Sequence, residues 1–199
     1  GAADQILHLQ KQVGNHAVQR LLHTHAHAAQ GPGALVQRWG GDEHYEIGQA
    51  AGIQIDLGNG VVLDWGEVVG LGGDELGSPE ELLEMTKTES GRARIRAALE
   101  QEDIVGNGVR TLPAPIDTEK EAQAVEYYTL LLDNVNHFQS GGKALDSYRG
   151  YHIKALNAAA AAGMEHPNDA AVDLNPAYLQ EAFGQHFLTD MFSSGHVIT

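Results

Sequence analysis

The sequence predicts an all-α fold, or one that is nearly so, with an N-terminal helical leader before the main domain. Apolar residues recur at helical spacing in most segments of the chain. Two segments also open on strong helix-start signals, at Ser78-Pro79 and at Asn175-Pro176. A strand pattern is confined to residues 53–63, where Gly58-Asn59-Gly60 predicts the turn of a short hairpin.

The leader is the first expected element. Ile6, Leu9, Val13 and Val18 recur at roughly helical spacing, which favours a helix over residues 1–22. Residues 23–35 contain three alternating histidines and a Gly-Pro-Gly run, so we expect an extended linker there. The spacing of these histidines is more typical of a polar linker than of a metal site. The remaining residues, 36–199, are expected to form the main domain.

The main domain is expected to consist of helices joined by short connections. Apolar periodicity predicts helices over residues 42–51, 78–88, 90–101, 118–132, 148–162 and 175–192. Residues 67–71 are expected to form a helical turn, and residues 106–115, which contain two glycines and two prolines, a loop. Gly163 is expected to stop the helix over residues 148–162.

Composition narrows the functional classes. The chain has no cysteine, so any metal must be bound by His, Asp or Glu, and eleven histidines are present. A net charge of −15 argues against sequence-independent binding to nucleic acid, which requires a basic surface. Hydrolysis of a phosphodiester inside a pocket stays open, because bound cations reverse the local field. No signal peptide and no bilayer-spanning run is evident, so we expect no stable membrane insertion.

The segment HFLTDMFSSGH, from His186 to His196, is the strongest candidate for chemistry. His186 and Asp190 lie four residues apart, so on a helix they project from one face and can share a metal. His196 follows a Ser-Ser-Gly sequence, which is expected to bend the chain and bring its imidazole to the same site. The alternative for the first pair is a helix cap or a surface contact.

This segment resembles the zinc-dependent phospholipases C and the S1/P1 nucleases, which share the pattern His-x3-Asp-x5-His. Both groups also have an upstream His-Phe, matched here by His137-Phe138, and an early His, matched by His44. Asp74 matches their intermediate Asp. Trp39 precedes His44 by five residues, as in the nucleases.

The resemblance implies an all-α domain that binds up to three zinc ions, and at least one. It assigns one zinc ion to His137, His186 and Asp74. Asp190 would bridge to a second ion held with His44, and His196 would begin the third site. Asp74 could equally be the catalytic general base beside the attacking water. Imidazole and carboxylate groups suit zinc, which clamps a phosphodiester and generates hydroxide at neutral pH.

Two features of the family are not seen in this chain. A second His-x3-Glu (or Asp) follows the equivalent of His196 in the family, whereas this sequence ends at Thr199, so either the sequence is truncated or the third site is incomplete. The family Trp binds zinc through a free α-amine. Trp39 instead lies inside the chain. Cleavage after Arg38 would free the α-amine of Trp39. One hypothesis is therefore that residues 1–38 keep a metal position unfilled until the protein is delivered to its target. The alternative is that Trp39 packs on the domain and that Asp42 or water fills the position.

A second resemblance lies in the leader. LHLQKQVGNHAVQRLL (Leu7 to Leu22) resembles an element near the start of cargo proteins of bacterial extracellular contractile injection systems. GDEHYEIG and LDWGEVVGLGGDELGSPEELLEM resemble later parts of such proteins. The resemblance implies a protein made in the bacterial cytoplasm without a signal peptide, loaded into the injection particle through residues 7–22 and delivered to a target cell. The alternative is an amphipathic helix that docks on its own domain.

Together the two resemblances imply a toxin or effector with a zinc-dependent phosphodiesterase domain that hydrolyses phospholipids. An S1/P1-type nuclease is the enzymatic alternative, which the spacing of Trp39 and His44 favours and the net charge disfavours. The other alternative is a catalytically inactive packing or interaction module of the injection particle.

A few further polar residues are candidates for supporting roles. His152 either lines the pocket or is a hydrogen-bonded structural histidine. Asp64, Trp65 and Glu67 either support the turn at Asp74 or simply pack. Asp133, four residues before His137, either orients that imidazole or is a solvated acid.

Overall fold

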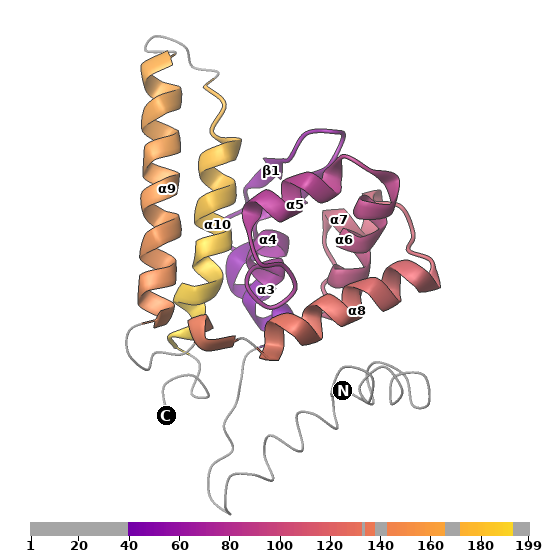
Figure 1. Ribbon diagram of the computed structural model, residues 1–199. Helices are drawn as coiled ribbons and strands as arrows, with labels where there is room; N and C mark the ends of the chain where they lie inside the picture. The colour runs from indigo at the N-terminus through magenta and orange to yellow at the C-terminus, as the bar shows by residue number, and fades with distance from the viewer. Residues whose placement is uncertain (1–39, 133, 138–142, 166–171, 193–199) are drawn as a thin grey trace, which may run out of the picture.

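The computed structural model describes residues 40–132, 134–137, 143–165 and 172–192, and it is mainly helical (Figure 1). The predicted fold class is therefore confirmed, whereas the expected leader and linker lie outside the described residues. The elements in chain order are α3 (Gly41–Gln49), β1 (Gln54–Asp56), β2 (Val62–Asp64), α4 (Trp65–Leu71), α5 (Pro79–Thr86), α6 (Glu89–Gln101), α7 (Asn107–Thr111), α8 (Asp117–Leu132), η1 (Asn134–His137), α9 (Lys143–Glu165) and α10 (Asn175–Asp190).

The predicted hairpin is present. β1 and β2 pair antiparallel, with the fully buried Ile55 opposite the fully buried Leu63. Gly58, Asn59 and Gly60 all have positive φ angles, of 76°, 55° and 76°. Glycine and asparagine adopt this backbone region at the lowest cost, which is why the sequence identified the turn correctly.

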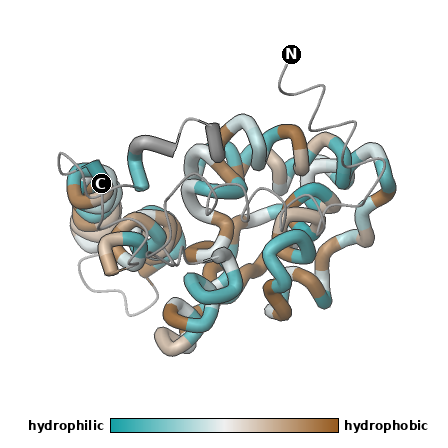
Figure 2. Tube along the Cα trace, turned by 90° about the horizontal axis from the view of Figure 1, so that it is seen from below, coloured by the Kyte–Doolittle hydropathy of each residue, from teal (hydrophilic) through white to brown (hydrophobic). Residues whose placement is uncertain are grey.

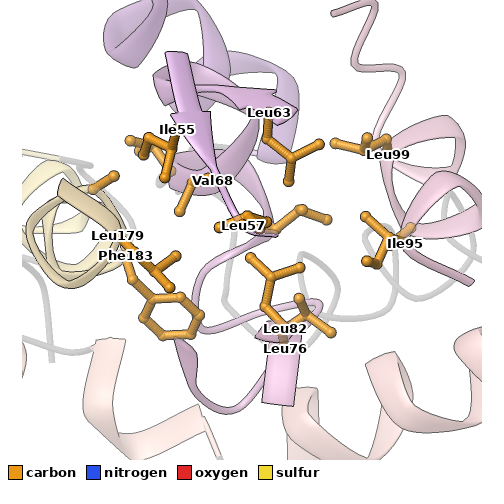
Figure 3. Packing of buried hydrophobic residues seen from close by; sticks show 14 of the residues in the cluster. Ile55, Leu57, Leu63, Val68, Leu76, Leu82, Ile95, Leu99, Leu179 and Phe183 are labelled. Carbon is orange, nitrogen blue, oxygen red and sulfur yellow. The ribbon is translucent and has the colours of Figure 1, made fainter. Parts of the chain in front are cut away.

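The helices are arranged around α4. α9 and α10 lie side by side and antiparallel along one flank, and α6 and α8 lie on the opposite side (Figure 1). Apolar side chains fill the space between them: Leu179 and Phe183 of α10 lie on one side of Val68, and Ile95 and Leu99 of α6 on the other (Figure 3). Hydrophobic and hydrophilic residues alternate along most helices (Figure 2), as amphipathic packing on a common core requires.

Helix α3 packs closely against α4. A Cβ atom at Gly66 would lie 2.6 Å from the carbonyl oxygen of Tyr45, and a Cβ atom at Gly48 would lie 2.9 Å from the Cα of Gly66. Glycine at both positions therefore allows the two helix backbones to touch. This contact places α3, and with it His44, directly beside the C-terminal end of α4.

The expectation of a loop over residues 106–115 is wrong in part, because α7 forms within it. Its N-terminus is capped by residues that are distant in sequence: Asp64 Oδ2 accepts from the backbone N–H of Asn107, and Glu67 Oε1 accepts from that of Gly108. The N-terminal amides of a helix need such acceptors. Asp64 and Glu67 therefore serve α7 rather than the turn at Asp74.

The expected stop at Gly163 is also wrong. α9 runs through this glycine to Glu165 and begins at Lys143, so it is longer at both ends than the predicted helix. One helical glycine costs about 1 kcal/mol relative to alanine, and the alanine-rich stretch before Gly163 has the highest helix propensity. No helix in the described ranges is both long enough and apolar enough to cross a membrane.

Glu67 is expected to make the stability of the fold depend on pH. Burial raises its pKa to about 7, against the opposing effect of backbone N–H donors such as that of Gly108. Because the pKa of Glu67 in the folded state exceeds its unfolded value, the contribution of this residue to stability is greatest below about pH 4.5 and is lost as pH rises towards about 7. We expect Glu67→Gln to flatten this decline, by up to about 3 kcal/mol across the interval.

Urea unfolding between pH 4.5 and pH 7.5 measures the effect of the Glu67 substitution. Glu43→Gln is the matched control, because Glu43 accepts from the N–H of Gly40 in the equivalent capping box of α3. An equal change of slope in both variants would contradict the assignment to Glu67.

Candidate metal centre

Five polar side chains from four parts of the fold meet at the C-terminal end of α10. They are His44 on α3, Asp74 in the turn after α4, His137 at the end of η1, and His186 and Asp190 on α10. The three histidines and Asp190 are buried, whereas the Asp74 side chain is 18 % exposed. His196, Asp133 and Trp39 lie outside the described residues, so their expected roles stay predictions.

Helix α10 presents His186 and Asp190 on one face, as the spacing predicts. His186 Nε2 lies 3.4 Å from Asp190 Oδ2. On the other side of the ring, His186 Nδ1–H donates to the carbonyl oxygen of Val69, at 3.1 Å. This carbonyl belongs to the last turn of α4, where backbone oxygens lack helical partners. The bond fixes the tautomer, so Nε2 carries the lone pair that faces Asp190.

His44 approaches the same carboxylate from α3. Its Nε2 lies 3.3 Å from Asp190 Oδ1, and its ring packs against that of His186 at a centroid distance of 4.2 Å. Its Nδ1 lies 2.6 Å from the hydroxyl of Thr189, which is also on α10. Thr189 was not identified from the sequence, although its position between His186 and Asp190 was the available signal.

His137 completes the group of imidazoles. Its Nδ1 lies 2.7 Å from Asp190 Oδ2 and 3.0 Å from His186 Nε2. The ring stands edge-on to His186 and contacts Phe187, which in turn stacks on Tyr151 of α9. One nitrogen of His137 is thus directed into the centre.

The turn after α4 brings Asp74 to the same point. Gly73 has a φ angle of 76°, and a Cβ atom there would lie 2.5 Å from His137 Cε1 and 2.9 Å from His186 Cδ2. Asp74 Oδ1 lies 3.7 Å from His137 Nδ1, and Asp74 Oδ2 lies 3.8 Å from His186 Nε2. Within the described part of the chain, the buried Oδ1 atom has no hydrogen-bond partner.

A hydrogen-bond network that the sequence did not predict anchors this turn on the side away from the centre. Glu75 is fully buried, and its side chain accepts from Gln101 and Gln123. Gln123 also donates to the backbone carbonyl of Glu75. Burial and the nearby carboxylate of Glu102 raise the pKa of Glu75 well above its usual value. The turn is therefore anchored to α6 and α8 through polar groups that no local pattern reveals.

The electrostatic environment of the centre favours a cation. Burial, together with the neighbouring His44, lowers the pKa of His186 to about 3. His186 is therefore a neutral imidazole at physiological pH, which is the form that binds a metal. Asp190, fully buried in the middle of three imidazoles, supplies two oxygen atoms in two directions.

The spacing of these atoms fits zinc. Two ligand atoms on a tetrahedral zinc ion at about 2.1 Å lie about 3.4 Å apart. The separations among the candidate ligand atoms run from 3.0 to 3.8 Å, apart from the hydrogen-bond distance between His137 and Asp190. Two sets of three side chains have ligand atoms within 4.8 Å of one another: His44, His186 and Asp190, and Asp74, His137 and His186.

The two sets share His186, but His186 offers only Nε2. Asp190 offers one oxygen towards His44 and one towards His186, so it is the group able to serve two ions. The arrangement therefore suits one ion between Asp74, His137 and His186, and a second between His44 and Asp190. Both positions offer nitrogen and oxygen donors, which can bind zinc.

Of the supporting residues expected from the sequence, His152 does not join the centre. Its Nδ1 lies 2.7 Å from a carboxylate oxygen of Glu181 on α10, and its ring stacks on Tyr148 of α9. Trp65 donates to Gln185 on α10 and packs edge-on against Tyr178, which makes it a packing residue.

The comparisons with known proteins assign no family to this chain. No family model matches it, and neither a curated protein nor a solved structure is significantly similar.

Proposed function

We propose that the chain is a zinc-dependent phosphodiester hydrolase, with phospholipid as its substrate. The observation that carries the proposal is the position of Asp190, whose two oxygens face His44 on one side and His186 on the other. Such a bridging carboxylate suits paired metal sites, which stabilise the attacking and leaving oxygens of a phosphodiester. When bound, zinc would neutralise developing charge and lower the pKa of a bound water.

The residues of the chain have distinct roles in this proposal. His44, His137, His186 and Asp190 are buried and would hold the ions in place. Asp74 is the most exposed of the five, so substrate would reach the centre from its side. Its carboxylate would either complete the ligand set or take a proton from the attacking water. His196 is proposed to begin a third zinc site.

The net charge of −15 favours a phospholipid over a nucleic acid, because a polyanion would be repelled over most of the surface. An S1/P1-type nuclease is the second candidate. An inactive packing module is the alternative outside the enzymes. Substrate tests distinguish the three, because the inactive module hydrolyses neither substrate, whether or not it binds metal.

The test uses the protein purified without a histidine tag. We expect elemental analysis to find stoichiometric zinc, and a chromogenic phosphorylcholine diester to be hydrolysed faster than single-stranded DNA. A chelator should abolish both hydrolysis and bound zinc. Natively folded protein that takes up no zinc would contradict the proposal. Zinc-loaded protein that hydrolyses neither substrate would support the inactive module.

The delivery of the domain is proposed separately. The leader motif over residues 7–22 supports loading into a contractile injection particle. Deleting residues 1–33 is expected to leave the melting temperature nearly unchanged and to stop co-purification with the particles. A large fall in melting temperature would mean that this segment belongs to the folded core instead.

A further inference from the structure

The hydroxyl of Thr189 lies between two helices of the candidate centre. Thr189 is buried on α10, next to Asp190 in sequence, and its Oγ1 lies 2.6 Å from Nδ1 of the fully buried His44 on α3. The same oxygen lies 2.8 Å from the carbonyl of His186 and 3.0 Å from that of Gln185. Thr189 thus connects the backbone of one ligand helix to the imidazole of the other.

The chemistry of these groups limits the possible directions of the hydrogen bonds. A carbonyl oxygen only accepts, and a hydroxyl has one hydrogen to give. If the hydroxyl hydrogen goes to the backbone of α10, as threonine in a helix commonly arranges, its lone pair is left for His44. His44 then donates from Nδ1, and its Nε2 carries the lone pair, 3.3 Å from Asp190 Oδ1.

We propose that Thr189 is a positioning residue that holds His44 in the tautomer whose Nε2 can bind a cation beside Asp190. The proposal rests on the zinc sites proposed above and adds a residue that the family resemblance did not supply. The reverse tautomer would place a hydrogen on Nε2, directed at Asp190 Oδ1, and would remove the ligand atom. The hydroxyl therefore decides whether His44 offers a lone pair or a hydrogen to this position.

Two substitutions separate the hydroxyl from its surroundings. Thr189→Val keeps the β-branched shape and removes the hydroxyl, whereas Thr189→Ser keeps the hydroxyl and removes a methyl group. We expect Thr189→Val to retain the zinc ion at Asp74, His137 and His186, and to bind the second ion about 10- to 100-fold more weakly. Thr189→Ser should bind both ions as the unaltered protein does. Isothermal titration calorimetry, in which zinc is added to the metal-free protein, measures both affinities.

A second measurement needs no metal. The nitrogen shifts of His44, recorded by NMR in the metal-free protein and assigned with His44→Gln, report which ring nitrogen carries the hydrogen. We expect hydrogen on Nδ1 in the unaltered protein and in Thr189→Ser, and on Nε2 in Thr189→Val. Hydrogen on Nε2 in the unaltered protein would overturn the inference even if Thr189→Val does not fold.

The two proposals fail in different ways. If the unaltered protein binds no zinc, the proposed function fails, and the NMR result shows whether Thr189 still sets the tautomer. If the unaltered protein binds two ions and Thr189→Val binds both equally well, the proposed function stands and the role of Thr189 is refuted.

Discussion

Asp190→Ala is expected to lose both zinc ions, whereas His44→Ala is expected to lose only one. Asp190 Oδ1 lies 3.3 Å from His44 Nε2, and Oδ2 lies 3.4 Å from His186 Nε2, so one substitution removes an oxygen from each proposed position. His44 contributes to one position only. Each lost ligand should weaken zinc binding by more than about 100-fold, because few ligands share the binding free energy.

Zinc content after dialysis against a fixed free-zinc concentration measures this difference. Asp190→Asn is the matched control for shape, since it keeps the size of the side chain and removes its charge. Circular dichroism of the metal-free variants establishes that each is folded. Retention of two ions by Asp190→Ala would remove the basis for a shared carboxylate, and with it the paired-ion centre.

Gly73→Ala is expected to disrupt both the fold and the centre. The added Cβ atom would lie 2.5 Å from His137 Cε1 and 2.9 Å from His186 Cδ2, closer than real Cβ contacts occur. The positive φ angle of 76° adds strain of about 1–2 kcal/mol for alanine. Because both imidazoles must shift, zinc affinity should fall together with the free energy of unfolding.

Gly60→Ala is the matched control, because Gly60 has the same φ angle of 76° and a Cβ atom there would meet nothing within 4 Å. The difference between the two variants therefore isolates the contact with the imidazoles. We expect Gly73→Ala to exceed the control by about 1 kcal/mol or more in urea unfolding. Equal losses in the two variants, with zinc binding unchanged, would show that the turn does not set the position of the histidines.

The centre also explains why Asp74 has two proposed roles. Its carboxylate lies 3.7 Å and 3.8 Å from the nearest nitrogens of His137 and His186, the longest separations in the group. A ligand at the edge of a site, partly open to solvent, can exchange a metal contact for a contact with water. The activity of Asp74→Asn relative to its zinc content separates the roles, because loss of a general base lowers hydrolysis without lowering zinc binding.

Some features were determined by the sequence alone, because they depend on neighbours along the chain. The face shared by His186 and Asp190 follows from the helical repeat, and the hairpin turn follows from the backbone freedom of Gly58 and Gly60. The start of α5 follows from Ser78, whose hydroxyl accepts from the N–H of Glu81. Such local rules act over four residues or fewer.

Other features were decided only by the tertiary structure. The resemblance assigned Asp74 and His137 to one zinc ion and His44 to a second, but the proximity of these residues depends on the close packing of α3 on α4 and on the backbone of Gly73. α7 formed where a loop was expected because Asp64 and Glu67 cap it from more than 40 residues away. The carbonyl of Val69 and the hydroxyl of Thr189 reach His186 and His44 only in the folded chain. Hydrogen bonds across such sequence separations leave no periodic pattern, which is why the sequence predicted the candidate ligands but not the groups that orient them.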